Sequence, residues 1–203
     1  MFFIRGSEEE HVNTNNNSFL NEKKGKRAKQ KNSFFVRLVA MKTFILLSAI
    51  PGSGKSTWAK QYKATHENTH IVASDEIRVA LWGKPNDFRD EKKVWETFNE
   101  LIHQYGKEEN VTVIADATNL QNKLREKYYR ATPEFDKHVL VLIKVPFEVS
   151  DAQNKMRCPD RIVPDHAMER LRGEYEDPTR EIIELYDEYV EIHDFMSKAA
   201  KKA

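Results

Sequence analysis

The chain has 203 residues, of which 32% are charged and 39% are hydrophobic, and its formal net charge is +1. Its single cysteine, Cys158, excludes an intramolecular disulfide and cannot build a zinc site by itself. The longest apolar stretches are far shorter than the roughly 20 residues that span a bilayer. We therefore expect one domain with an appendage, located in the cytoplasm and without a membrane partner.

The first 40 residues differ in composition from the rest of the chain. They contain a polar tract, HVNTNNNS, and a basic run, NEKKGKRAKQK, and neither shows a helical or strand period. We predict that residues 1–40 are a disordered or non-native extension, with Met41 as a hypothetical natural start. Alternatively, the basic run is an arm for nucleic acid or for targeting. Residues 41–203 carry a formal net charge of −3, so any polynucleotide contact there must be local.

The stretch MKTFILLSAI, residues 41–50, has the basic start and the apolar run of a short signal peptide. A glycine-rich loop follows it at the place where a cleavage site would be expected. We therefore interpret this stretch as a buried first strand.

From residue 43 onward, strand patterns and helix patterns alternate along the chain. Strands are predicted at 44–48, 70–73, 111–116 and 138–145. Helices are predicted at 56–64, 76–82, 94–105, 123–130, 149–156, 164–175 and 180–198. This alternation is typical of a parallel sheet with helices on both faces, so we expect residues 41–203 to form one doubly wound α/β domain.

Residues 49–56 read AIPGSGKS, which matches the P-loop pattern G-x-x-x-x-G-K-[ST] except that Ala49 replaces the first glycine. In such a loop, backbone N–H groups bind phosphate oxygens, Lys55 approaches the β and γ phosphates, and Ser56 ligates Mg²⁺. The alternative is a glycine-rich turn without a ligand. The predicted strand before the loop and helix after it favour the P-loop, with ATP and Mg²⁺ as cofactors. The predicted nucleotide-binding residues here are Gly52, Ser53, Gly54, Lys55, Ser56 and Thr57.

Asp75 and Arg78 open the helix after the second predicted strand. In an open parallel sheet the carboxyl ends of the strands line the ligand crevice, so we expect Asp75 to face the P-loop. A carboxylate there can accept the proton of an attacking hydroxyl, and Arg78, one turn later, can hold an anionic part of the acceptor. The alternative is that Asp75 caps the helix and that Arg78 is solvated.

The third predicted strand brings Asp116 to the same edge, and Thr118 and Asn119 follow it. An aspartate in this place commonly holds Mg²⁺, directly or through water. Asp116, Thr118 and Asn119 are also candidates for substrate binding. The alternative for Thr118 and Asn119 is that their side chains cap the next helix.

Residues 154–164 form a connection between two predicted helices that is punctuated by prolines and contains Arg157 and Arg161. Such a helical lid can close over the nucleotide, bring positive charge to the transferring phosphoryl group and exclude water. Both arginines are therefore predicted nucleotide contacts. The alternative is an ordinary surface loop.

Taken in order, six short motifs resemble the 5′-kinase domain of phage-type polynucleotide kinases and related P-loop kinases. They are PGSGKSTWA at 51–59, Asp75-x-x-Arg78, DATNL at 116–120, Asn154-x-x-Arg157, Val163-Pro164 and EYEDPT at 174–179. The resemblance covers residues 42 to about 190. It implies ATP-dependent transfer of phosphate to a 5′-hydroxyl, with Asp75 as the general base, Arg78 on the acceptor's phosphate and Arg157 as the lid arginine. Gln153 stands where an arginine often precedes the lid asparagine in this family.

The sequence therefore predicts a P-loop NTPase of the nucleotide-kinase-like class, with Asp75, Lys55 and Arg157 as its catalytic residues. The favoured acceptor is the 5′-hydroxyl of a DNA or RNA end. One alternative is the same fold acting on a small hydroxyl compound, such as a nucleoside, a sugar or an antibiotic. A second alternative is a nucleotide-binding module without kinase activity.

Overall fold

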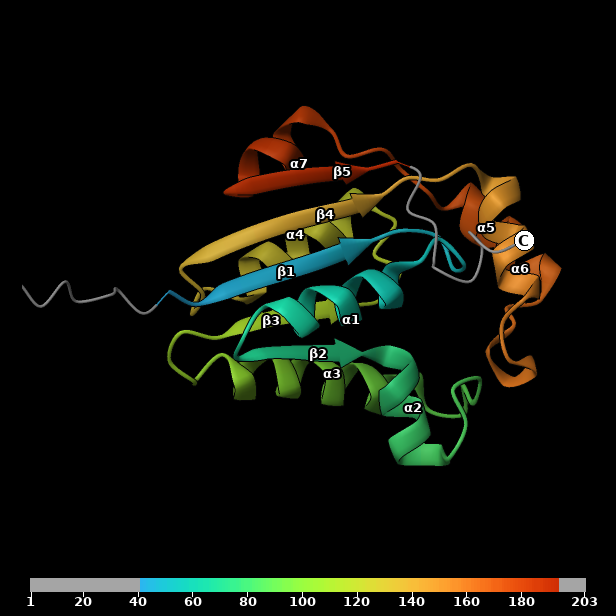
Figure 1. The fold of residues 1–203 in the computed structure, drawn as a ribbon, viewed down its shortest axis with the longest axis horizontal. Coiled ribbons are helices and arrows are strands. Elements are labelled where there is room, and N and C mark those ends of the chain that lie inside the picture. The colour runs from blue at the N-terminus through green and yellow to red at the C-terminus, as the bar shows by residue number, and fades with distance from the viewer. Residues whose placement is uncertain (1–40, 194–203) are drawn as a thin grey trace, which may run out of the picture. The chain divides into compact units, whose positions relative to one another are not determined.

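Figure 1 shows the computed structural model of the protein, which describes residues 41–193. The expectations for residues 1–40, and for the end of the last predicted helix at 194–198, lie outside the described residues. Within the described range, none of the helices combines the length and the apolar character that a membrane crossing requires.

A sheet of five parallel strands forms the centre of the domain. The strands are β1 (Thr43–Ser48), β2 (Thr69–Ala73), β3 (Thr112–Asp116), β4 (Lys137–Ile143) and β5 (Glu188–Ile192). They lie in the order β2-β3-β1-β4-β5, so β1 pairs with a strand on each side, and all of its residues are buried. The run TFILLS suits this place because a strand covered on both faces needs apolar residues at successive positions.

Helices cover both faces of this sheet, as predicted. They are α1 (Lys55–Thr65), α2 (Ser74–Trp82), α3 (Glu91–Tyr105), α4 (Asn122–Ala131), α5 (Phe147–Lys155), α6 (Asp165–Gly173) and α7 (Arg180–Leu185), with a 3-10 turn, η1 (Pro159–Arg161). On one face, in front in Figure 1, α1 contributes Ala59 to a core that contains Ile45 of β1. On the other face, α3 and α4 contribute Phe98 and Tyr128 to a core that contains Phe44. The doubly wound α/β fold is therefore confirmed.

The predicted helix at 180–198 is wrong beyond residue 185. Helix α7 ends at Leu185, and Glu188–Ile192 forms β5, which pairs in parallel with β4. The segment EYVEI is rich in aromatic and β-branched residues, which suit a strand, and the exposed edge of β4 supplies its backbone partners. The local spacing of apolar residues fits a helix as well, so the open edge of the sheet decides between the two structures.

All five strands end at the same edge of the sheet, on the right in Figure 1, because they are parallel. The segments that follow β1, β2, β3 and β4 therefore begin at this one edge. It is the edge at which open α/β sheets bind ligands.

We expect the substitution Phe44→Ala to lower the free energy of unfolding by about 3–5 kcal/mol, because it empties a fully buried place in the core. The ring centroid of Phe44 lies 5.5 Å from that of Phe135 and 5.9 Å from that of His138. The matched control is Phe88→Ala, the same change at a side chain that is 62% exposed, which should cost less than about 1 kcal/mol. Urea unfolding measures both values, and equal losses would contradict this assignment of the core.

Candidate active site

The loop between β1 and α1, residues 49–54, has the backbone of a phosphate-binding loop. Gly52 and Gly54 have φ angles of 86° and 96°, in the left-handed region that glycine adopts at little cost. Ala49 is fully buried, and its N–H donates to the carbonyl oxygen of Thr118 over 3.0 Å. A small side chain therefore fits where the P-loop pattern has glycine, and the loop is anchored to the segment after β3.

Gly52 allows this loop to pack directly on the backbone of α5. A Cβ atom on Gly52 would lie 2.1 Å from the carbonyl oxygen of Ser150 and 3.0 Å from the backbone nitrogen of Asn154. Glycine is therefore required here both by its φ angle and by the space available. The contact ties the P-loop to the first helix of the predicted lid.

Lys55, Asp75, Asp116 and Arg157 come from separate elements and meet at the carboxyl edge of the sheet. Asp116 is the last residue of β3 and is buried. Burial raises the pKa of Asp116 and lowers the pKa of Lys55, and the attraction between these two opposite charges partly offsets both shifts. A hydrogen bond with Ser56 further reduces the rise, but the pKa of Asp116 remains above its ordinary value. The structure thus brings together the three predicted catalytic residues and the two predicted Mg²⁺ ligands.

Arg78 lies in a network of ion pairs and is not solvated. Its Nη1 atom donates to Asp75 Oδ1 over 3.0 Å, and its Nε and Nη2 atoms donate to the two carboxylate oxygens of Glu91 over 2.8 and 2.7 Å. Only 6% of Arg78 is exposed. Asp75 lies inside the first turn of α2, whose N-cap is Ala73, so the alternative of a capping Asp75 is wrong.

Glu91, the first residue of α3, is the residue of this network that the sequence patterns missed. Its carboxylate binds the Arg78 guanidinium through two hydrogen bonds, which fixes the plane of the guanidinium. The two residues lie 13 positions apart on different helices, and no motif links them. The only signal in the sequence is that Glu91 is an acidic residue at the start of a helix. Such residues commonly stabilise the positive end of the helix dipole, so this signal does not indicate a pairing with Arg78.

The segment between α5 and α6 lies against the first turn of α2. Arg157 Nη2 is 3.6 Å from Asp75 Oδ2, and Arg161 Nη2 donates to Glu76 Oε1 over 2.9 Å. The pairing with Glu76 raises the pKa of Arg161. This segment is therefore attached to α2 by charged contacts, and its closure over a nucleotide stays a prediction beside the alternative of an ordinary surface loop.

Asn154 fixes the base of this lid segment. Its fully buried side chain donates to the carbonyl oxygen of Val163 over 2.7 Å and accepts from the N–H group of Val163 over 3.0 Å. One amide thus closes the loop that carries both arginines. Gln153, its neighbour, has a buried Nε2 atom without a hydrogen-bond partner among the described residues.

Asn119 and Thr118 lie behind the P-loop and join two strand ends. Asn119 has a φ angle of 45°, and its Nδ2 atom donates to the carbonyl oxygen of Leu47 over 2.8 Å. Ser48 Oγ donates in return to the carbonyl oxygen of Asn119 over 2.9 Å. The Asn119 side chain therefore positions the loop after β3, and substrate binding by these two residues stays a prediction.

Arg125 of α4 also forms hydrogen bonds at the carboxyl end of β1. It is fully buried, and burial lowers its pKa. Its Nη2 atom donates to Ser48 Oγ over 3.0 Å, and its Nη1 atom donates to Asn122 Oδ1 over 2.7 Å and to the carbonyl oxygen of Glu176 over 2.8 Å. This side chain therefore links β1, α4 and the EYEDPT segment at 174–179.

The loop itself fits a phosphate ligand. Ser53 Oγ is buried and has no hydrogen-bond partner within the part of the chain that the structure describes, so the loop retains an unused polar group. Ser56 and Thr57 lie in the first turn of α1, directly after the left-handed Gly54. A helix N-terminus of this kind binds anions through its N–H groups.

The donor set also fits Mg²⁺. Among residues 41–193, no group of three or more His, Cys, Asp or Glu side chains is arranged to hold a metal ion. Mg²⁺ needs no such cage, because it keeps several water ligands and is held by one or two protein groups together with phosphate oxygens. Ser56 and Asp116 supply two such groups.

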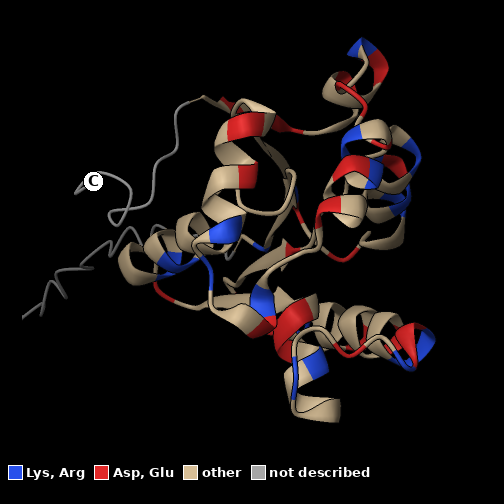
Figure 2. Ribbon diagram, turned by 90° about the vertical axis from the view of Figure 1, so that its right-hand side faces the viewer, with Lys and Arg blue, Asp and Glu red and all other residues tan. Residues whose placement is uncertain are grey.

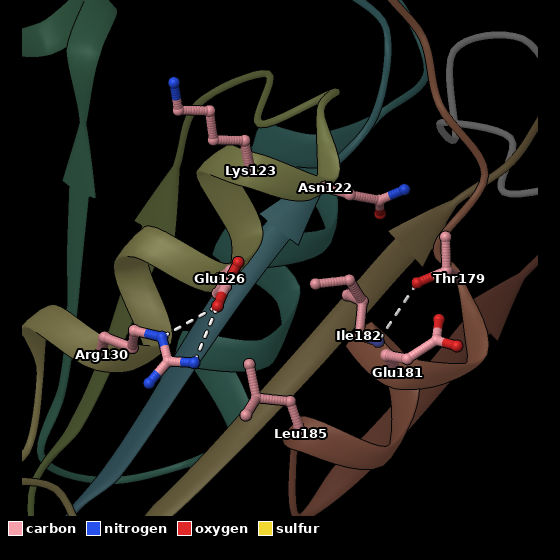
Figure 3. Close-up of a pocket in the computed structure, with 8 residues that line it drawn as sticks. All are labelled: Asn122, Lys123, Glu126, Arg130, Thr179, Glu181, Ile182 and Leu185. Atoms are coloured by element: carbon pink, nitrogen blue, oxygen red, sulfur yellow. Dashed lines mark hydrogen bonds and ion pairs between the residues drawn. The ribbon is translucent and has the colours of Figure 1, made fainter.

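Two cavities lie outside this set of predicted residues. One of about 470 Å³ lies between α4 and α7, and Figure 3 shows the ion pair of Glu126 and Arg130 on its wall. A second, of about 190 Å³, lies beside Ile50 of the P-loop and is also lined by Phe147 and Ser150. None of the predicted site residues lines either cavity. The predicted site itself is characterised by the ion pairs of Asp75 and Glu76 with Arg78, Arg157 and Arg161.

Comparison with known families defines the class of the protein. A family model described as AAA domain matches residues 45–178, which include the P-loop, Asp75, Asp116 and the lid arginines. Together with the fold, this match defines a P-loop nucleotide-binding domain. The chain belongs to this AAA domain family. No curated protein sequence matches it.

Solved structures share the fold at low sequence identity. A chain of the Pnkp1/Rnl/Hen1 RNA repair complex is 22% identical with a TM-score of 0.59, and the match covers 72% of this chain but 47% of that one. Kti12 of Chaetomium thermophilum, solved with ADP-AlF3, is 14% identical with a TM-score of 0.56, over 78% and 93% of the two chains. Shikimate kinase of Bacteroides thetaiotaomicron is 16% identical with a TM-score of 0.51, over 77% and 90%. The resemblance to P-loop kinases is therefore confirmed for the fold.

We expect Gly52→Ala to weaken nucleotide binding and to destabilise the protein, because the new Cβ would collide with the carbonyl oxygen of Ser150 at a positive φ angle. The matched control is Gly173→Ala at the end of α6, where a Cβ meets no atom within 4 Å. Calorimetric titration with ADP and thermal unfolding measure both effects. Normal ADP binding by the Gly52 variant would contradict the close packing of the P-loop on α5.

We expect Glu91→Gln to lower the free energy of unfolding by about 1.5–3 kcal/mol, because it removes the charge that faces a buried guanidinium. The matched control is Glu126→Gln, which breaks the exposed ion pair with Arg130 and should cost about 0–1 kcal/mol. Urea unfolding distinguishes the two variants. A loss no larger at Glu91 than at Glu126 would show that Arg78 does not depend on Glu91.

Proposed function

We propose that this protein is an ATP-dependent kinase that transfers the γ-phosphoryl group to a hydroxyl, and that its acceptor is the 5′-hydroxyl of a polynucleotide. The observation that carries the proposal is the position of Asp75. Its carboxylate is held by Arg78 at 3.0 Å and faces Arg157 at 3.6 Å, at the edge where Lys55 and Asp116 lie. Asp75 as proton acceptor, Arg78 as the proposed cation for the substrate, and Lys55 and Arg157 as the proposed cations for the nucleotide thus lie at one edge of the sheet.

Residues 49–57 would bind the phosphates of the nucleotide. The N–H groups of the loop and of the first turn of α1 would bind the phosphate oxygens, and Ser53 Oγ supplies a further donor. Lys55 places its positive charge on the β and γ phosphates. Mg²⁺, when bound, would neutralise charge on the same phosphates, with Ser56 and Asp116 as the residues that hold it.

Asp75 is the general base of the proposed reaction. Its side chain is 40% exposed, so an acceptor can reach it. As the hydroxyl oxygen bonds to the γ phosphorus, the bond from that phosphorus to the β,γ-bridging oxygen breaks, ADP leaves, and the hydroxyl proton passes to Asp75. The ion pair with Arg78 holds the carboxylate in place for this transfer.

Arg157 and Arg161 supply the charge of the lid. In the structure they pair with Asp75 and Glu76 of α2, which places both guanidinium groups at the site edge. On nucleotide binding, Arg157 would move from the carboxylate to the transferring phosphoryl group, where negative charge spreads in the transition state. Thr118, in the segment after β3, would be a further acceptor contact, whereas the buried side chain of Asn119 is bonded to Leu47 and would act by positioning that segment.

The choice of a polynucleotide acceptor has two supports. The six ordered motifs resemble those of polynucleotide 5′-kinases, and Arg78, which this resemblance implies for the acceptor's phosphate, lies beside Asp75, where it would have to exchange a carboxylate partner to bind that phosphate. The second candidate is a small hydroxyl compound, which the charge distribution favours. Figure 2 shows positions of acidic and basic residues interspersed along the described backbone on the side of the domain where the strands end.

The test is transfer of labelled γ-phosphate from ATP to 5′-hydroxyl oligonucleotides, DNA and RNA in parallel, beside nucleosides and sugars. We expect labelled oligonucleotide, and a loss of turnover of about 10² to 10³ in Lys55→Ala, Asp75→Asn and Arg157→Ala. The matched control is Asp136→Asn, at the amino end of β4, which should retain full activity. Higher salt should weaken binding of an oligonucleotide but not of a neutral small acceptor.

Three outcomes would overturn parts of this proposal. Label only in a small acceptor would replace the polynucleotide by the second candidate. Full activity of Lys55→Ala would remove the site assignment. ATP binding without transfer to any acceptor would identify a nucleotide-binding module.

A further inference from the structure

We infer that the ring of Phe88 is a stacking platform for the nucleobase at the 5′ end of a single-stranded acceptor. This inference rests on the proposed polynucleotide kinase function and names the group that recognises the acceptor. It assigns a role to a loop, residues 83–90 between α2 and α3, that carries none of the predicted site residues.

Phe88 is exposed in a way that core packing does not explain. Among the described residues, four large hydrophobic side chains are exposed, and Phe88 is the aromatic one, at 62%. The others are Met41, Leu124 and Met156. A single exposed hydrophobic side chain is common on protein surfaces, and what distinguishes Phe88 is its contact with the buried guanidinium of Arg78.

The ring lies next to the proposed general base. The Arg78 guanidinium carbon lies 4.8 Å from the centroid of the Phe88 ring, and the same guanidinium donates to Asp75 at 3.0 Å. The Arg78 guanidinium therefore contacts both the Phe88 ring and the Asp75 carboxylate, which places the exposed ring beside the proposed general base.

The loop that carries Phe88 is held in place at both ends and in its middle. Gly83, with a φ angle of 79°, ends α2 and donates its N–H to the carbonyl oxygen of Val79. Asp90 caps α3 by accepting from the N–H of Lys93 over 3.0 Å. Between them, Asp87 accepts from the backbone N–H of Arg89 over 3.2 Å. A ring on such a loop is positioned before the ligand arrives, which reduces the entropy cost of binding.

The charged side chains around the ring are compensated in pairs, and Arg78 itself is paired with Asp75 and Glu91. Asp87 forms an ion pair with Arg89, so its negative charge is compensated close to the ring. Arg78 lies on the ring itself, and Arg89 lies 5.4 Å from the ring centre of Trp82. Stacking of a base on an aromatic ring tolerates every base, because each base has a π face.

The experiment measures transfer kinetics with two acceptors, a 5′-hydroxyl oligonucleotide and the same oligonucleotide with an abasic 5′-terminal nucleotide. We expect Phe88→Leu to raise KM for the intact acceptor by roughly 5- to 100-fold, the range that base–aromatic stacking implies, and to leave KM for ATP unchanged. With the abasic acceptor the variant and the wild type should have the same KM. Phe88→Tyr should retain the wild-type values, because it keeps the ring.

The control is Leu124→Ala on α4, which removes another exposed hydrophobic side chain and should change no kinetic constant. An equal effect of Phe88→Leu on both acceptors, or an equal rise in KM for ATP, would overturn the stacking role.

Anisotropy of a labelled oligonucleotide separates the two proposals, because it measures binding without transfer. Binding that depends on Phe88 without transfer would retain the platform and remove the kinase. Transfer that does not depend on Phe88 would retain the kinase and remove the platform. Absence of both binding and transfer would remove both.

Discussion

The site depends on the hydrogen bonds that fix the carboxyl end of β1 to the segment after β3. Asn119 donates from its side chain to the carbonyl oxygen of Leu47, and Ser48 donates back to the carbonyl oxygen of Asn119. The Arg125 guanidinium then donates to the Ser48 hydroxyl from below. Because β1 carries the P-loop and β3 carries Asp116, these bonds set the position of the loop relative to the carboxylate. Asparagine suits the linking position because it tolerates the left-handed backbone found there.

The charges at this edge compensate one another, and they do so with unequal strength. Arg78 makes three hydrogen bonds of 3.0 Å or less to Asp75 and Glu91, whereas Arg157 approaches Asp75 only to 3.6 Å. A buried guanidinium needs such close partners, because an uncompensated buried charge is strongly destabilising. The looser contact belongs to the segment between α5 and α6, and in the proposed function this segment is the lid whose Arg157 would exchange Asp75 for a phosphoryl group.

The charge of the domain restricts how the proposed polynucleotide acceptor would bind. Acidic and basic positions are interspersed along the described backbone on the side where the strands end, and residues 41–203 carry a net charge of −3. Counterion release over a wide basic surface is therefore not available as a source of affinity. Under the proposed function, the exposed ring of Phe88 beside Asp75 would contact only the 5′ end of the acceptor.

The sequence by itself determined the P-loop, the first four strands and the doubly wound architecture. These features follow from local rules: glycines where φ is positive, and continuous apolar runs where both faces of a strand are covered. It also placed Lys55, Asp75 and Asp116 at one edge, because residues at the ends of parallel strands share that edge.

The tertiary structure decided what depends on partners distant in the chain. The segment at 188–192, which the sequence predicts as helix, forms a strand because the open edge of β4 offers it backbone hydrogen-bond partners. The pairing of Arg78 with Glu91 and the exposure of Phe88 also follow from how α2, its loop and α3 pack. The spacing of apolar residues and the charge of a side chain limit which secondary structures and ion pairs a segment can form. The neighbours that the fold supplies determine which of these structures and pairs is the most stable.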